Sequence, residues 1–278
     1  MGQLAHKDNM KDILDAMSRE GATQFEPEER EVFVRWLQIL ENTGMPFLLG
    51  GAFAVHAYTG VWRDTKDLDI FIWPRDLKKA LHALASVGFK TEVPYPNWLA
   101  KARQEPYVMD LIFGVWNGQI PVDQDWFKRS VPGEVAGVPV QIMPIEEILA
   151  SKLYVAARDR FDGSDVLHLI RCSRGNIDWK RVLARLDGNY ELLLWHFILF
   201  DFAYPGHTEY LPQDLVVRLF ERVRLGWSEP RDPKKFRGSL LDPFSFEVDL
   251  KDWGYQEERR MEPLVDHNGD LLHESARE

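Results

Sequence analysis

Apolar residues in the first half of the chain follow two spacings, one typical of helices and one typical of strands. In residues 27–43 they recur every three or four positions, which predicts an amphipathic helix that ends at Gly44 and Pro46. Residues 51–58 and 77–87 are also compatible with helices. Short apolar runs predict strands at residues 47–49, 68–72, 89–93, 107–113 and 138–143. This half therefore alternates strands and helices.

After Pro144 the pattern becomes helical. Helices are predicted over residues 145–158, 164–172, 179–186, 190–202 and 211–224, which favours a helical bundle. Beyond Gly226, four prolines and an excess of acidic residues indicate an extended tail. The predicted fold class is α+β, a mixed sheet with helices followed by a helical bundle. The predicted domains are an N-terminal arm (1–25), an α/β core (26–145), a helical domain (146–226) and an acidic tail (227–278).

The composition restricts the environment and the partners. The 278 residues carry a formal net charge of -10, which argues against a protein that coats nucleic acid. Cys172 is the only cysteine, so the chain cannot form an intrachain disulfide, and a reducing cytoplasm is the simplest expectation. No apolar segment is long enough for a membrane helix, and the first thirty residues lack the pattern of a secretory signal.

Three aspartates stand where charges are unexpected. Asp67 and Asp69 lie two positions apart in a predicted strand and therefore project from the same face. Adjacent carboxylates repel each other, and a divalent cation removes that penalty. Asp110 interrupts another apolar strand. If it faces the same site, two Mg²⁺ or Mn²⁺ ions roughly 4 Å apart could clamp an in-line displacement.

A glycine pair precedes the first of these strands. Gly50 and Gly51 follow a predicted strand and begin a helix, so backbone amides could approach phosphate oxygens there. Arg63 and Thr65 could brace the strand of Asp67 or contact a phosphate. Each feature has an ordinary alternative, because Asp-x-Asp is usually a surface feature and Gly-Gly is usually a turn. Their order and spacing favour a nucleotide site.

The segment LLGGAFAVHAYTGVWRDTKDLDIFI resembles the signature of the polymerase-β-type nucleotidyltransferase superfamily. More narrowly, it is similar to AbiEii-like bacterial nucleotidyltransferases, some of which are toxins of toxin–antitoxin pairs. The resemblance implies that Asp67 and Asp69 bind the metals and that Gly50 and Gly51 contact the triphosphate. It further implies that Asp110 helps to deprotonate the acceptor hydroxyl.

A second segment, ASKLYVAARDRFDGSDVLHLI, is similar to the K-x(5)-R…D-x-x-D segment of AbiEii-like proteins. The resemblance implies that Lys152 reaches nucleotide phosphates with support from Arg158 or Arg160, and it matches an acidic pair to Asp162 and Asp165. Phe161 departs from the family pattern, which has a base there. The ordinary alternatives are that Lys152 is solvated and that the other four charged residues form a structural network of salt bridges between two helices: Arg158, Arg160, Asp162 and Asp165.

These features predict an enzyme that transfers a nucleoside monophosphate from ATP or another NTP to an acceptor hydroxyl and releases pyrophosphate. The alternative is a catalytically silent nucleotide-binding protein with the same fold. A tRNA end, another protein and a small molecule stay open as acceptors, and the resemblance also implies an antitoxin partner. RNA is slightly favoured because of the family resemblance and not because of the charge. A run of five bases could contact a few phosphates, although a solvated helix face is the more frequent explanation of so short a run: Arg171, Arg174, Lys180, Arg181 and Arg185.

Overall fold

The computed structural model describes residues 27–63, 65–115, 118, 120–258 and 262–272. The chain divides into two compact units. The first unit comprises residues 1–144 and 262–278, and the second comprises Ile145–Met261. The predicted N-terminal arm, residues 1–25, lies outside the described residues.

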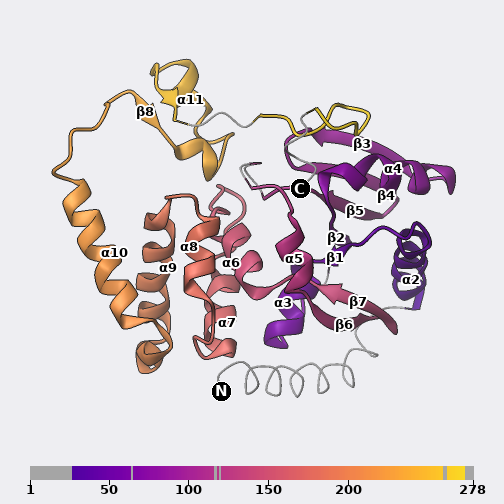
Figure 1. The fold of residues 1–278 in the computed structure, drawn as a ribbon, viewed down its shortest axis with the longest axis horizontal. Coiled ribbons are helices and arrows are strands. Elements are labelled where there is room, and N and C mark those ends of the chain that lie inside the picture. The colour runs from indigo at the N-terminus through magenta and orange to yellow at the C-terminus, as the bar shows by residue number, and fades with distance from the viewer. Residues whose placement is uncertain (1–26, 64, 116–117, 119, 259–261, 273–278) are drawn as a thin grey trace. The chain divides into compact units, whose positions relative to one another are not determined.

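A seven-stranded sheet forms the centre of the first unit (Figure 1). Its strand order is β3-β4-β5-β2-β1-β7-β6. Strand β5 runs parallel to β2 and β7 runs parallel to β1, whereas the other neighbouring pairs are antiparallel. The sheet is therefore mixed, as the sequence predicts. The strands are β1 (Leu48–Leu49), β2 (Asp67–Phe71), β3 (Lys90–Tyr95), β4 (Leu99–Gln104), β5 (Tyr107–Ile112), β6 (Val131–Val135) and β7 (Val138–Ile142).

Helices of the first unit pack on this sheet and on one another. Helix α3 contacts β2, and α4 contacts β3, β4 and α2. The aromatic rings of α2 and α3 supply much of the core, and Phe33 meets Phe53 edge to face at 5.6 Å. The helices are α2 (Pro27–Asn42), α3 (Gly51–Thr59), α4 (Leu77–Ser86) and α5 (Gln124–Lys128), with a 3₁₀ turn η2 (Pro74–Asp76).

Three elements of the first unit are missing from the predicted pattern. In strand β4, Lys101 lies between the buried Ala100 and Ala102 and Arg103 follows them, so the strand lacks an apolar run. Strand β6 contains Pro132 and Gly133, which indicate a turn in a sequence. Among the described strands β6 stands at the end of the sheet order beside β7, and proline is tolerated at such an edge. Helix α5 is only five residues long and too short to show a helical period.

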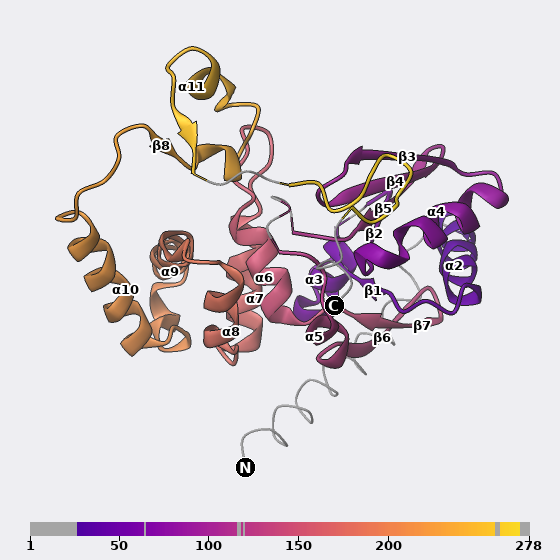
Figure 2. The same cartoon turned by 45° about the horizontal axis from the view of Figure 1, so that its top comes forward.

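The second unit is predominantly helical, as predicted (Figure 2). Helix α6 packs against α7, α8 and α9, and α9 packs against α10. Among the described residues no helix is both long and apolar enough to cross a membrane. The elements are α6 (Ile145–Leu153), α7 (Gly163–Ser173), α8 (Trp179–Arg185), α9 (Tyr190–Ala203), η3 (Pro205–Tyr210), α10 (Gln213–Gly226), β8 (Lys235–Phe236), η4 (Gly238–Leu240), α11 (Glu247–Lys251) and β9 (Gln256–Glu257).

Helix α6 is shorter than its predicted span of 145–158. It ends at Leu153, and the chain then turns back on itself before α7. In this loop Ala157 N donates to Arg160 O at 2.8 Å, and Asp162 N donates to Val155 O at 3.2 Å. The turn brings the end of α6 beside the start of α7.

Residues 262–272 return to the first unit, whereas residues 227–258 belong to the second. Leu264 N and Val265 N both donate to Pro96 O, at 2.9 and 3.1 Å. Val265 is fully buried, and Asp270 forms an ion pair with Lys78 of α4 at 2.7 Å. The predicted tail is thus shared between the two units, and residues 262–272 are anchored by packing as well as by charge.

Candidate functional site

Strands β2 and β5 bring the three predicted carboxylates to one face of the sheet. Asp69 and Asp110 are register partners on these neighbouring parallel strands. Such partners have side chains on the same face, and the strands lie about 4.8 Å apart. Asp67 shares that face because it is two positions before Asp69. Leu68 and Ile70 are fully buried on the opposite face, whereas the face of the two aspartates becomes apolar at Phe71.

The glycine pair lies directly against this acidic face. Gly50 N donates to Asp69 O at 2.9 Å, which joins the start of α3 to β2. Gly51 has φ +54°, and a Cβ there would lie 1.7 Å from Asp69 Oδ2. Any side chain at Gly51 would therefore displace the carboxylate. The positive end of the α3 dipole lies beside Asp69, where it lowers the cost of that charge.

Two further predicted residues lie at the entry to β2. The Thr65 hydroxyl donates to Asp67 O at 3.2 Å and accepts from Asp67 N at 3.1 Å. This is a local turn, and it agrees with the bracing role that the sequence left open for Thr65. Arg63 is exposed.

Asp110 forms an ion pair that the sequence analysis did not include. Lys101 Nζ donates to Asp110 Oδ1 at 2.7 Å and to Oδ2 at 3.0 Å. Burial raises the pKa of Asp110, the Lys101 ammonium opposes that rise, and the negative charge of Asp67 adds to it. Sequence reasoning missed Lys101 because β4 was not predicted. The available signal was the alternation of bases and alanines in LAKARQ.

The donor set suits a divalent cation in its chemistry. Three carboxylates on one face supply the hard oxygens that Mg²⁺ and Mn²⁺ prefer. In the described part of the chain, however, no three Asp, Glu, His or Cys side chains are close enough together to hold a metal ion. Because both Asp110 oxygens contact Lys101, the ammonium competes with a metal ion for this carboxylate.

The second group of predicted residues forms a buried ion-pair network within the second unit. Lys152 Nζ lies 2.7 Å from Asp162 Oδ2 and 2.7 Å from Asp165 Oδ2. The side chains of these three residues are 8%, 9% and 3% exposed. The network joins the end of α6 to the start of α7. This geometry favours the structural alternative, and the contact of Lys152 with a nucleotide stays a prediction.

Two arginines flank this network. Arg160 donates through Nε and Nη2 to Asp162, each at 3.1 Å. Burial raises the pKa of Asp162, but the hydrogen bond from Arg160 and the charge of Lys152 outweigh it and leave that pKa below its usual value. Arg158 has an exposed side chain, and its backbone N donates to Asp242 at 3.0 Å.

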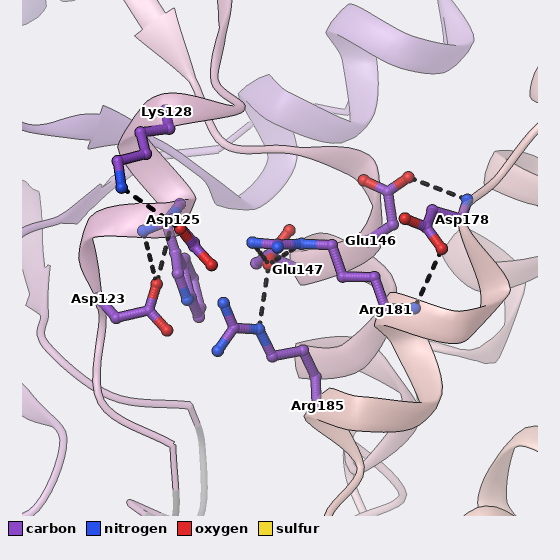
Figure 3. Close-up of polar contacts among 9 residues, drawn as sticks. Asp123, Asp125, Lys128, Glu146, Glu147, Asp178, Arg181 and Arg185 are labelled. Atoms are coloured by element: carbon purple, nitrogen blue, oxygen red, sulfur yellow. Dashed lines mark hydrogen bonds and ion pairs between the residues drawn. The ribbon is translucent and has the colours of Figure 1, made fainter. Parts of the chain in front are cut away.

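The basic run of residues 171–185 is only partly at the surface. Arg181 and Arg185 both donate through Nε to Glu147 Oε1, at 2.7 and 3.2 Å (Figure 3). The Glu147 side chain is fully buried, and burial raises its pKa although both guanidinium groups oppose that rise. The arginine side chains are only 11% and 15% exposed. These two bases therefore hold α8 to α6, whereas the other three bases of the run are exposed: Arg171, Arg174 and Lys180.

Several solved structures are similar to part of this chain. ANT(2'')-Ia in complex with adenylyl-2''-tobramycin is 16% identical, with a TM-score of 0.45 over 59% of this chain and 99% of that one. The lincosamide antibiotic adenylyltransferase LnuA is 20% identical, with a TM-score of 0.39 over 52% of this chain and 96% of that one. JHP933 from Helicobacter pylori is 13% identical, with a TM-score of 0.37 over 82% of this chain and 99% of that one. No protein-family model and no curated protein matches the sequence.

Proposed function

We propose that the chain is a metal-dependent nucleotidyltransferase, with Asp67, Asp69 and Asp110 as its metal-binding carboxylates. The observation that carries this proposal is the pairing of Asp69 with Asp110 on neighbouring parallel strands. Three acids on one sheet face repel one another, and that repulsion is useful only if a cation binds. Gly51 supports the proposal because it leaves space for a carboxylate beside a helix N-terminus.

The proposed reaction replaces one phosphoanhydride bond with one phosphoester bond. The acceptor oxygen attacks the α-phosphorus of the NTP, the bond to the bridging oxygen breaks, and pyrophosphate leaves with the electron pair. A carboxylate oxygen of Asp110 takes the hydroxyl proton. The Gly51 amide at the start of α3 orients the triphosphate, whereas the Gly50 amide donates to Asp69 O and holds α3 on β2. Two Mg²⁺ or Mn²⁺ ions would neutralise the phosphates and both reacting oxygens.

The acceptor is proposed separately, because the basic run gives only partial support to RNA. With Arg181 and Arg185 on Glu147, three exposed bases are left to contact phosphates. Any RNA footprint is therefore small, and a protein or a small hydroxylated molecule is an equal alternative.

The decisive experiment supplies the protein with α-³²P-labelled NTPs, Mg²⁺ and a cell extract, and identifies the labelled product by mass spectrometry. Asp69→Asn should abolish labelling and leave the circular dichroism spectrum unchanged. The matched control is Asp252→Asn, an exposed aspartate of the second unit, which should label normally. Nucleotide binding without any labelled product would instead support the catalytically silent alternative. Labelling that persists in Asp69→Asn would contradict the metal assignment.

A toxin role, which the resemblance to AbiEii-like proteins implies, has its own test. Expression of the chain without an antitoxin partner should arrest bacterial growth, and Asp69→Asn should relieve the arrest. Growth that is unaffected by the wild-type protein would remove the toxin role and leave the enzymatic proposal intact.

A further inference from the structure

A row of charged residues crosses four neighbouring strands of the first unit. Glu92 on β3 is the register partner of Lys101 on β4, and Lys101 is the register partner of Asp110 on β5. Asp110 in turn is the register partner of Asp69 on β2. Since register partners share a face, the row runs from a carboxylate through an ammonium to two carboxylates. Lys101 is thus the positive charge that borders the candidate metal site.

Glu92 and Asp110, the two register partners of Lys101, accept hydrogen bonds from different bases. Glu92 lies opposite Lys101 but accepts from Arg103 instead, through Nε at 3.1 Å and Nη2 at 2.9 Å. Lys101 contacts both oxygens of Asp110. That pair is better shielded from water, because its side chains are 23% and 17% exposed whereas those of Arg103 and Glu92 are 37% and 51% exposed. An ion pair that is shielded from water is also screened less by salt.

We propose that Lys101 is an internal counter-cation that occupies Asp110 in the metal-free protein and is exchanged for metal when nucleotide binds. This inference rests on the proposed function. The ammonium repels a divalent ion and competes with it for both Asp110 oxygens, so metal alone binds weakly. When the triphosphate arrives, its oxygens give the displaced ammonium a new anionic partner. Metal and nucleotide therefore stabilise each other's binding.

The exchange predicts effects of opposite sign on two affinities when the ammonium is removed. In Lys101→Met, Mn²⁺ alone should bind at least about tenfold more tightly than to the wild type, because no ion pair has to be broken first; a tenfold change corresponds to about 1.4 kcal/mol. At saturating Mn²⁺, the non-hydrolysable analogue α,β-methylene-ATP should bind about tenfold more weakly, because the released ammonium is absent. A merely structural lysine would not produce this inverse pair of changes.

Isothermal titration calorimetry of the full chain measures both affinities. The matched control is Lys78→Met, which removes an equally short but exposed ion pair with Asp270 and should change neither affinity. Lys101→Arg keeps the charge and should keep the weak Mn²⁺ binding. If Lys101→Met fails to fold, as judged by circular dichroism, Lys101→Gln provides the same comparison with a polar side chain.

The outcomes separate this inference from the proposed function. Tighter Mn²⁺ and weaker analogue binding in Lys101→Met, both abolished when Asp69→Asn is added, support the exchange. Equal Mn²⁺ affinity of wild type and Lys101→Met, with binding still lost in Asp69→Asn, overturns the exchange and leaves the metal site standing. Tighter Mn²⁺ with unchanged analogue affinity also overturns the exchange. If neither protein binds Mn²⁺, the exchange is overturned and the proposed function is weakened as well.

Discussion

Replacing Lys152 by Met tests whether the buried network of the second unit serves stability or the nucleotide. The substitution keeps most of the aliphatic volume and removes the charge that lies 2.7 Å from both Asp162 and Asp165. Breaking a buried ion pair by removing one partner typically costs about 3–5 kcal/mol, because the other charge is left buried. Arg160, whose side chain is 58% exposed, still contacts Asp162 after the substitution. Because Asp162 keeps this cationic partner, we expect a cost at the lower end of the range.

The assay measures two quantities on one sample. Urea unfolding gives the free energy of unfolding, and NTP titration of the folded protein gives its affinity. At about 2–4 °C per kcal/mol, a loss of about 3–5 kcal/mol lowers the melting temperature by about 6–20 °C. Lys251→Met is the control, because Lys251 forms an exposed ion pair with Glu247 of the same unit and its loss should cost at most about 1 kcal/mol.

A structural network leaves the nucleotide affinity of folded Lys152→Met unchanged. A structural role for Lys152 is refuted if Lys152→Met is about as stable as the Lys251→Met control while its NTP affinity falls tenfold or more. That result would show that the ammonium leaves its carboxylates to bind phosphate, as the resemblance to AbiEii-like proteins implies. Adding Asp165→Leu should recover part of the lost stability if the cost comes from a buried carboxylate without its cation.

Three further predictions concern other parts of the molecule. Gly51→Ala should destabilise the protein and abolish nucleotide binding, because the added methyl group would overlap the Asp69 carboxylate. Gly60→Ala is the control, because Gly60 has φ +72° but open space around it. Its thermal melting therefore measures only the cost of placing alanine at a positive φ. The Asp242 pKa is lowered to about 2, chiefly by hydrogen bonding with Ser245, so the stability it confers is complete above about pH 3.8 and is lost as the pH falls through about 2. In Asp242→Asn the free energy of unfolding should therefore fall less steeply between about pH 3.8 and 2 than in the wild type. An equally steep fall in both proteins would contradict the lowered pKa of Asp242. If single-stranded RNA binds through three exposed bases, the logarithm of its binding constant should fall with the logarithm of the salt concentration with a slope of roughly -2. Arg174→Ala combined with Lys180→Ala should make that slope less steep. If the slope is the same in the double variant, this surface is not the RNA site.

The sequence alone predicted most helices and most strands, because these depend on local periods of two and about 3.6 residues. The same local rule placed Asp67 and Asp69 on one face of a strand. The sequence also predicted that a helix begins at Gly50 and Gly51. Strand β4 was missed because its bases and alanines lack an apolar period, and the early end of α6 depends on a loop that closes back through Asp162.

The partners of the charged side chains were decided by the tertiary structure. From the sequence, Lys152 could equally be a solvated or a phosphate-binding base, and Arg181 and Arg185 counted toward a binding patch. Burial against carboxylates that are distant in the sequence determines what these bases contact. The pairing of Lys101 with Asp110 likewise depends on the order of β4 and β5 in the sheet and on their register. A sequence period fixes which face a side chain occupies, but only the packing of separate elements determines which charge lies opposite it and how much water lies between them.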